Sequence, residues 1–304
     1  MIYQGDCREM LAGMSAKSVQ CCITSPPYFG LRDYGVEGQI GHEQTPEEYV
    51  QNLLGVFRGV WRVLRNDGTL WLNLGDSYAG SRKGYGSAGG EKQQTNKGSI
   101  GTNKPPTARE IGLKPKDLIG IPWRVAFALQ AEGWYLRNDI IWHKPNPMPE
   151  SVKDRCTRSH EYLFLLTKSR KYYYDSDAIL EPYVSDIEPP RDKAAENYNQ
   201  NVPIFSEGKR SYYSRGGRNK RDVWTIPLRP YGGAHFATFP EKLVEPCILA
   251  GTRRGDTVLD PFSGAGTVGV VCRKTGRDFV GIELNQKYID LSEKRIGETE
   301  IRLL

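Results

Sequence analysis

Two short stretches of the chain place reactive residue types directly after apolar runs. The first is Ser25-Pro26-Pro27-Tyr28, which follows the apolar residues 19–24. Both prolines fix φ and remove a backbone donor, so this segment should be stiff and extended at the end of a buried strand. Ligands bind at the carboxyl ends of strands in open α/β sheets, where the segment would present a hydroxyl, carbonyl oxygens and an aromatic ring. A Pro-Pro turn that only closes the strand fits the spacing equally well.

The second stretch, DPFSGAGTVG at residues 260–269, begins at the end of another apolar run. Gly264, Gly266 and Gly269 match the pattern G-x-G-x-x-G at a predicted strand-to-helix turn, and Glu283 ends the next predicted strand. Glycines at this turn let the backbone approach a nucleotide, and a carboxylate at the next strand end can accept hydrogen bonds from ribose hydroxyls. The pattern predicts an adenosine-containing ligand, and NAD and S-adenosylmethionine both satisfy it.

The position of the glycine turn in the chain separates these two cofactors. Only about 35 residues follow Gly269, and a dinucleotide-binding fold places several strand–helix units after its glycine turn. The remaining strands must then come from the N-terminal part of the chain. We therefore expect a permuted sheet, in which Ser25 precedes the glycine turn in sequence but lies near it in space.

Predicted helices and strands alternate along the chain. Thr45-Pro46-Glu47-Glu48 is a capping box with proline at the first helical position, and Asp67-Gly68 is predicted to turn the chain into a strand. Strands that alternate with helices predict an α/β fold with a mostly parallel sheet covered on both faces. The predicted helices are 45–65, 117–132, 238–251, 265–275 and one from 286, and the predicted strands are 19–24, 69–75, 134–143, 161–169, 256–260 and 278–283.

Positive charge is concentrated in two segments that interrupt this alternation. Residues 79–109 hold six Lys or Arg, one Glu and seven glycines, and residues 191–221 hold eight Lys or Arg and three acidic residues. The whole chain carries a net charge of only +6. Solvated surface loops explain the polarity, but tyrosines among the cations also suit phosphate attraction and base stacking. We interpret 79–109 as a flexible basic insertion and 183–222 as a target-recognition segment.

The length and composition predict a soluble protein with either one large domain or a core and a smaller lobe. Of the 304 residues 38% are hydrophobic, which is enough for a sizeable core without disulfide bonds. The six cysteines and four histidines show no metal-ligand spacing, so reduced core thiols and no metal site are expected. The chain also shows no signal peptide and no long apolar stretch, which predicts a cytoplasmic protein without membrane contact.

Five stretches of the chain resemble motifs of the β-class amino-group DNA methyltransferases, in the order of that class. The stretch SPPY resembles the catalytic motif, and DPFSGAGT resembles the S-adenosylmethionine motif. YQGDC at residues 3–7 resembles the segment near the cofactor adenine, and IWHKPNP at 141–147 resembles the stretch after the middle strands. HFATFPEKL at 235–243 resembles the helix-opening motif that packs on the methionine end of the cofactor. The resemblance covers nearly the whole chain.

The resemblance implies a single methyltransferase domain over residues 1–304 with a Rossmann-like, S-adenosylmethionine-dependent sheet, circularly permuted motif order and inserted DNA-recognition segments. Such an enzyme methylates an exocyclic amino group of a base that leaves the DNA duplex. The implied partner is double-stranded DNA in a prokaryotic or phage context. A cognate restriction endonuclease and the choice between monomer and homodimer stay open. The implied catalytic residues are Ser25, Pro26, Pro27 and Tyr28, and the implied cofactor-binding residues are Asp6, Phe239, Pro240, Asp260, Phe262, Ser263, Gly264, Gly266, Thr267 and Glu283.

The first residue of the SPPY stretch favours one base. In the family that it resembles, Ser before Pro-Pro usually accompanies cytosine, whereas Asp or Asn usually accompanies adenine. The Ser25 hydroxyl is short and can donate as well as accept, which suits the amino edge of cytosine. Because adenine presents a similar edge, methylation of N4 of cytosine is expected and methylation of N6 of adenine is the alternative.

Three further functions are compatible with parts of the sequence. A carbon-5 cytosine methyltransferase needs a cysteine nucleophile, and Cys247 follows Pro246, but it lies on the apolar stripe of a predicted helix. An NAD-dependent oxidoreductase would leave the SPPY stretch without a role. A DNA-binding module without catalysis would explain the basic segments but not the two small-ligand motifs.

Overall fold

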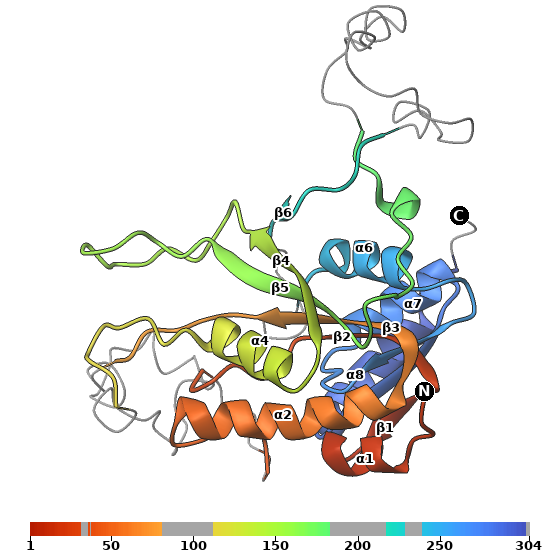
Figure 1. Ribbon diagram of the computed structural model, residues 1–304, viewed down its shortest axis with the longest axis horizontal. Helices are drawn as coiled ribbons and strands as arrows, with labels where there is room; N and C mark the ends of the chain where they lie inside the picture. The colour runs from red at the N-terminus through yellow and green to blue at the C-terminus, as the bar shows by residue number, and fades with distance from the viewer. Residues whose placement is uncertain (32–35, 37, 81–111, 183–216, 229–238, 302–304) are drawn as a thin grey trace, which may run out of the picture.

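The computed structural model of the chain is built on one eight-stranded sheet with the strand order β1-β8-β7-β2-β3-β5-β4-β6 (Figure 1). The structure describes all residues except 32–35, 37, 81–111, 183–216, 229–238 and 302–304. Most of the two basic segments, and residues 235–238 of the HFATFPEKL stretch, therefore lie outside the described residues. The strands are β1 (Ile2–Gln4), β2 (Val19–Thr24), β3 (Leu64–Leu74), β4 (Tyr135–His143), β5 (His160–Thr167), β6 (Val223–Thr225), β7 (Thr257–Asp260) and β8 (Asp278–Glu283).

Most neighbouring strands in the sheet are parallel, as the alternation of elements predicts. The pairs from β1 through β8, β7 and β2 to β3 are all parallel, and β4 is parallel to β6. Strand β5 is the exception, because it lies antiparallel to both of its neighbours, β3 and β4. The amino end of β5 therefore lies at the same edge of the sheet as the carboxyl ends of β2 and β3.

Helices cover both faces of the sheet (Figure 1). Buried side chains of α1 (Cys7–Gly13), α2 (Pro46–Val63) and α4 (Ile121–Ala131) form one core cluster. Those of α6 (Glu241–Gly251) and α7 (Thr267–Thr275) form the other, on the opposite face. Helix α8 (Gln286–Gly297) packs beside α7, and a short 3-10 helix, η2 (Asp177–Ile179), contacts α6. The two clusters bury the strands from both sides, and β2 is buried along its whole length.

Helix α2 begins where its capping box predicts. The side chain of Thr45 accepts a hydrogen bond of 3.1 Å from the backbone N–H of Glu48, and Pro46 occupies the first turn. The helix ends at Val63, and β3 starts at the next residue. The predicted turn at Asp67-Gly68 was wrong, because residues 65–68 are part of β3 and form an irregular stretch. There the register with β2 shifts, so that Val19 pairs with Leu64 but Cys21 pairs with Thr69.

Helix α4 begins four residues later than predicted, at Ile121 instead of Asp117. The residue before it, Gly120, has a left-handed backbone with φ of 79°, and Pro122 lies in the first turn. The carboxylate of Asp76 accepts hydrogen bonds from the backbone N–H groups of Gly120 and Ile121 at 3.0 and 3.1 Å. These donors have no partner within a first helical turn, so a remote carboxylate fixes the start of the helix. Among the described residues, no helix is long and apolar enough to cross a membrane.

Candidate active site

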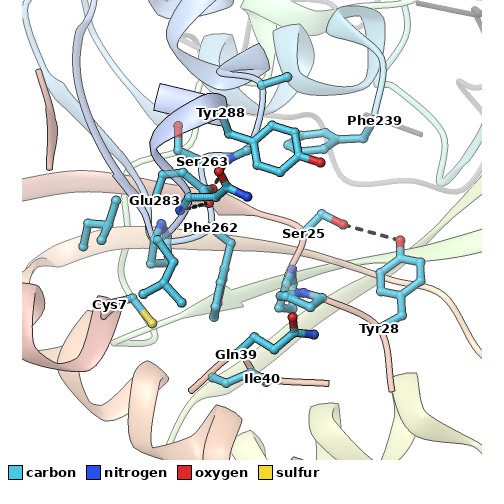
Figure 2. A pocket seen from close by; sticks show the side chains of 18 of the residues that line it. Cys7, Ser25, Tyr28, Gln39, Ile40, Phe239, Phe262, Ser263, Glu283 and Tyr288 are labelled. Carbon is cyan, nitrogen blue, oxygen red and sulfur yellow. Dashed lines mark hydrogen bonds between the residues drawn. The ribbon is translucent and has the colours of Figure 1, made fainter. Parts of the chain in front are cut away.

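A cavity of about 270 Å³ opens at the carboxyl edge of the sheet, between the SPPY stretch and the glycine turn. Figure 2 shows Phe262, Glu283 and Tyr288 on one side of the cavity, with Ser25 and Tyr28 across from them. The two stretches follow β2 and β7, which are adjacent parallel strands. Adjacent parallel strands end at the same edge of a sheet, so the permuted order predicted from the sequence brings both motifs into one cavity.

The SPPY stretch is held by contacts with helix α2 and with the loop before it. The hydroxyl of Tyr49 on α2 donates a hydrogen bond of 2.8 Å to the carbonyl oxygen of Pro27. The rings of Phe29 and Tyr49 pack with centroids 5.7 Å apart. Gly41 has φ of 107°, and a Cβ atom there would lie 3.2 Å from the carbonyl oxygen of Tyr28. The loop therefore approaches the stretch closely, and the proline segment is fixed from both sides.

Tyr28 points its hydroxyl into a polar group of side chains. The hydroxyl lies 2.7 Å from Oε2 of Glu161 and 3.1 Å from Oδ1 of Asn73. Burial raises the pKa of Tyr28 well above its ordinary value, and the Glu161 carboxylate raises it further. Gly75 makes room for the ring, because a Cβ atom at this position would lie 2.5 Å from Cε2 of Tyr28. Tyr28 is therefore a neutral hydrogen-bond donor in a fixed position.

Glu161 and Lys144 join Tyr28 and Asn73 in lining one side of the cavity with polar groups. We call these four residues the polar wall. The ammonium group of Lys144 donates a hydrogen bond to Oε1 of Glu161, and both side chains are largely buried, with exposed fractions of 14% and 16%. The ammonium group also lies 4.3 Å from the ring centroid of Trp142, a cation–π contact. Glu161 was not predicted as a site residue, because the direction of its strand within the sheet was not predicted. Lys144 lies in the IWHKPNP stretch, and this resemblance was the signal that could have found it.

The glycine turn and Glu283 are joined directly. The backbone N–H of Gly264 donates a hydrogen bond of 2.8 Å to Oε2 of Glu283, and that of Asn285 donates one of 2.9 Å to Oε1. Burial raises the pKa of the Glu283 carboxyl, and these backbone donors oppose the shift. Gly266 has φ of 73°, and a Cβ atom there would lie 2.1 Å from Oγ of Ser292. The turn can therefore form only with glycine at this position.

Two aspartates support the cofactor side of the cavity. Asp6 accepts a hydrogen bond of 2.7 Å from the backbone N–H of Arg8 and caps helix α1, and the Arg8 side chain lowers the pKa of the Asp6 carboxyl. Asp260 is fully buried at the end of β7. Burial raises the pKa of the Asp260 carboxyl to about 7. Its Oδ2 atom and Oγ of Ser263 are buried without a hydrogen-bond partner among the described residues.

The cavity collects most of the residues predicted for the site. Ser25, Pro26, Pro27, Tyr28, Asp6, Phe239, Phe262, Ser263, Gly264, Thr267 and Glu283 line it. Three predicted residues lie behind this lining, since Asp260 and Gly266 shape the turn from inside and Pro240 precedes α6. Lining residues that sequence reasoning missed include Cys7, Gln39, Ile40, Asn73, Trp142, Lys144, Glu161, Leu228, Asn285 and Tyr288.

The cysteines mostly follow the prediction of buried thiols. Cys7, Cys21, Cys22, Cys247 and Cys272 are buried, whereas Cys156 is exposed, so the prediction was wrong for Cys156. Cys156 lies in the long connection between β4 and β5, which explains its exposure. Cys247 is fully buried within α6, and burial raises the pKa of its thiol well above the ordinary value. A buried neutral thiol is a poor nucleophile, so carbon-5 chemistry has no support at this residue.

The side of the cavity next to the glycine turn has groups that could hold S-adenosylmethionine. Glu283 has acceptor oxygens at the end of β8 for ribose hydroxyls. The aromatic side chains of Phe239, Phe262 and Tyr288 give this side an apolar surface for a flat base (Figure 2). Ser263, which lines the cavity, has a buried hydroxyl oxygen beside the glycine turn with no partner in the described part of the chain. Polar atoms of this kind are expected where a ligand completes the hydrogen bonds.

Comparisons with known proteins agree with this geometry. A family model described as DNA methylase, for N6 and N4 methyltransferases, matches residues 19–294. The chain is 50% identical to the type II methyltransferase M.SmaI of Serratia marcescens over 97% of this chain and 90% of that protein. It is 49% identical to the type II methyltransferase M.Cfr9I of Citrobacter freundii over 97% of this chain and 87% of that protein.

Solved structures show the same fold. The PvuII DNA methyltransferase, described as cytosine-N4-specific, gives a TM-score of 0.61 at 18% identity over 99% of this chain and 94% of that chain. A DNA modification methylase of Thermus thermophilus, in complex with S-adenosyl-L-methionine, gives 0.60 at 22% identity over 100% and 98%. The chain therefore belongs to the family of amino-group DNA methylases, which comprises the N6-adenine and N4-cytosine enzymes.

Proposed function

We propose that this protein transfers the methyl group of S-adenosylmethionine to N4 of cytosine in duplex DNA. The observation that carries the choice of cytosine is Ser25, a compact hydroxyl side chain at the carboxyl end of β2 that lines the same cavity as the glycine turn. Family membership supports the methyl transfer itself and leaves the nicotinamide-dependent alternative without support. Membership of the family does not decide which base is methylated, so the choice of cytosine is the part that we propose.

The amino group of cytosine needs help to attack a methyl group. Its lone pair is delocalised into the ring, so the site must hold the nitrogen in line with the sulfonium methyl and favour a more pyramidal nitrogen. Two hydrogen-bond acceptors on the amino protons achieve this. The Ser25 hydroxyl and the Pro26 carbonyl are the proposed acceptors, because both belong to the rigid stretch that lines the cavity. The lone pair of the nitrogen would then form the new bond to the methyl carbon as the carbon–sulfur bond breaks, S-adenosylhomocysteine would leave, and the nitrogen would lose one proton to solvent.

The shape of the site supports a base that has left the duplex. Ser25, Tyr28 and Glu161 lie within a cavity, so a base stacked inside a double helix could not reach them. Base flipping is the general solution for enzymes that modify one base. The basic segments 79–109 and 183–222 are the proposed contacts with the DNA backbone, because they concentrate the positive charge of the chain.

Relatives named as type II methyltransferases suggest a protective role. M.SmaI and M.Cfr9I both carry that description. We extend it to this chain as part of the proposal, with a cognate restriction endonuclease as the partner activity. Methylated sites would then resist that nuclease.

Mass spectrometry of nucleosides tests the proposed base. DNA is incubated with the purified enzyme and S-adenosylmethionine, then digested to nucleosides, and N4-methylcytosine is the expected product. Finding 6-methyladenine without N4-methylcytosine would overturn the assignment of the base and leave the amino-methyltransferase function standing. Finding 5-methylcytosine would overturn both. Sequencing the same methylated DNA and locating its modified bases identifies the DNA sequence that the enzyme recognises.

A further inference from the structure

A chain of hydrogen bonds leads from the catalytic serine into the protein. Oγ of Ser25 contacts Oη of Tyr28 at 3.4 Å, and that hydroxyl contacts Oε2 of Glu161 at 2.7 Å. Lys144 donates to the other oxygen of Glu161. The first contact is long for a pair of hydroxyls, as hydrogen bonds of catalytic groups often are before the substrate binds. We call Ser25, Tyr28 and Glu161 the serine relay.

The negative charge of Glu161 decides to which oxygen each hydroxyl of the serine relay donates its proton. An ionised carboxylate only accepts hydrogen bonds, and Glu161 accepts from the Lys144 ammonium group at its other oxygen, Oε1. The single proton of the Tyr28 hydroxyl therefore goes to Glu161, which is closer than Asn73 and charged. The Tyr28 oxygen is then left to accept the proton of Ser25.

This direction decides what Ser25 can do for the target base. A serine hydroxyl can donate or accept, and a hydroxyl that donates to the base would not accept a proton of the amino group. When the Ser25 proton points to Tyr28, both lone pairs of Ser25 Oγ remain available to the amino protons. Glu161 and Tyr28 therefore make Ser25 an acceptor before the substrate arrives, which lowers the cost of orienting it.

The surroundings of the serine relay hold Glu161 in place. Asn73 donates hydrogen bonds to Oε2 of Glu161 at 3.3 Å and to the carbonyl oxygen of Tyr162 at 3.0 Å. Lys144 is fixed in turn by its contact with the ring of Trp142. Each partner of Glu161 thus comes from a different part of the sheet: Tyr28 from the segment after β2, Asn73 from β3 and Lys144 from the residue after β4.

We propose that Glu161 is a positioning residue of the methyl transfer, which acts through Tyr28 to hold the Ser25 hydroxyl as an acceptor for the target amino group. The inference rests on the proposed role of Ser25, but it holds for either base. Glu161 itself does not need to touch the substrate. Its removal should therefore lower the rate of methyl transfer and leave the binding of S-adenosylmethionine and DNA intact.

A double-mutant cycle between Tyr28 and Glu161 tests this inference. Tyr28→Phe keeps the ring and removes the middle hydroxyl. Glu161→Gln keeps the size of the side chain but loses the charge, and its amide can donate to Tyr28 and reverse the relay. We expect each variant to lower kcat by about 10- to 100-fold, the range for losing one hydrogen bond to a charged group. The KM for DNA should not change. The double variant should be no slower than Tyr28→Phe, because the relay is already broken.

Matched controls separate the relay from general effects of the same substitutions. Tyr172→Phe removes a hydroxyl that accepts from Arg137 at 3.3 Å outside the cavity, and Glu132→Gln breaks an ion pair with Arg58 of 2.7 Å on the surface. Both controls should keep wild-type kcat. Effects of Tyr28→Phe and Glu161→Gln that multiply in the double variant, or an unchanged kcat in either, would overturn the inference.

A second readout does not depend on activity. The phenol of Tyr28 is titrated by ultraviolet difference spectroscopy and assigned by its loss in Tyr28→Phe. Because the Glu161 carboxylate raises the pKa of Tyr28, Glu161→Gln should lower the pH at which this phenol ionises. An unchanged titration means that the two groups are not coupled and overturns the inference. If the wild-type enzyme methylated no DNA, the proposed function would fail while this titration still judged the relay.

Discussion

Oγ1 of Thr24 donates a hydrogen bond of 2.6 Å to Oδ1 of Asp260, and both residues are fully buried. Thr24 directly precedes Ser25, and Asp260 directly precedes the glycine turn. One buried hydrogen bond thus joins the strand that ends in the proposed catalytic stretch to the strand that ends in the cofactor motif. This hydrogen bond therefore holds the start of the SPPY stretch next to the start of the glycine turn.

The buried carboxyl of Asp260 should make the stability of the protein depend on pH. Burial raises the pKa of this carboxyl from its ordinary value of 3.8 to about 7 in the folded protein. Between these values the native state binds more protons than the unfolded state, so the free energy of unfolding should fall as the pH rises from about 4 to about 7. Asp260→Asn cannot titrate and should lose this part of the dependence. Urea denaturation of both proteins across this pH range measures it, and parallel pH curves would contradict the prediction.

Ser25→Ala should separate catalysis from cofactor binding. The substitution removes one proposed acceptor of the target amino group and leaves the bond between Gly264 and Glu283 intact. We expect methyl transfer to fall by roughly 10- to 1,000-fold, the range for loss of one preorganised hydrogen bond in a transition state. Calorimetry should show unchanged affinity for S-adenosylmethionine. Ser18→Ala, on an exposed hydroxyl, is the control. Loss of cofactor affinity in a folded Ser25→Ala protein would place Ser25 in the cofactor pocket instead.

Glu283→Ala should weaken the binding of S-adenosylmethionine by about 1 to 3 kcal/mol, the usual loss for a hydrogen bond to a charged group. Since Glu283 also accepts hydrogen bonds from Gly264 and Asn285, the glycine turn loses its anchor in this variant. Glu283→Gln keeps one acceptor oxygen and should show a smaller loss. Isothermal titration calorimetry compares these variants with Glu293→Ala on the exposed face of α8, which should bind as the wild type does. Equal affinity in Glu283→Ala and the wild type would remove Glu283 from the site.

Gly75→Ala should displace the ring of Tyr28. A Cβ atom at Gly75 would lie 2.5 Å from Cε2 and 3.0 Å from Cδ2 of that ring, closer than side chains approach each other in folded proteins. We therefore expect a lower kcat with an intact overall fold, because Gly75 lies after the end of β3 and the displaced ring would lose its contact with Glu161. Gly55→Ala adds the same methyl group on helix α2 with nothing within 4 Å, and should keep wild-type kcat. Circular dichroism shows whether both variants fold, and equal rates would refute the prediction.

Neutralising cations of the second basic segment should flatten the salt dependence of DNA binding. Each phosphate contact that is lost lowers the slope of log affinity against log salt by roughly 0.9. Lys209, Arg210 and Arg215 changed to glutamine are expected to show this smaller slope in fluorescence anisotropy with duplex DNA. Arg58 and Lys294 lie exposed on α2 and α8, and their neutralisation serves as the comparison. A slope that stays the same in the first variant would mean that this segment does not contact DNA.

The sequence by itself determined the order of most helices and strands and the two motifs that line the cavity, the SPPY stretch and the glycine turn. Proline pairs, glycine turns and capping boxes act within a few residues, so their effect can be read locally. Thr45 caps α2 as predicted, and Glu283 ends β8 as predicted. The count of residues after Gly269 was enough to predict a permuted sheet, because a strand that is missing at one end of a chain must come from the other.

Only the tertiary structure decided which strand brings the polar wall to the cavity. Local patterns do not encode strand direction, so nothing in the sequence indicated that Glu161, near the amino end of β5, lies near Ser25, which follows β2. Because β5 runs antiparallel to β3, its first residues lie at the carboxyl edge of the sheet, where Tyr28 reaches Glu161 across 133 positions of sequence. Contacts of this kind arise from packing and pairing between distant segments, and no local pattern of residues records them.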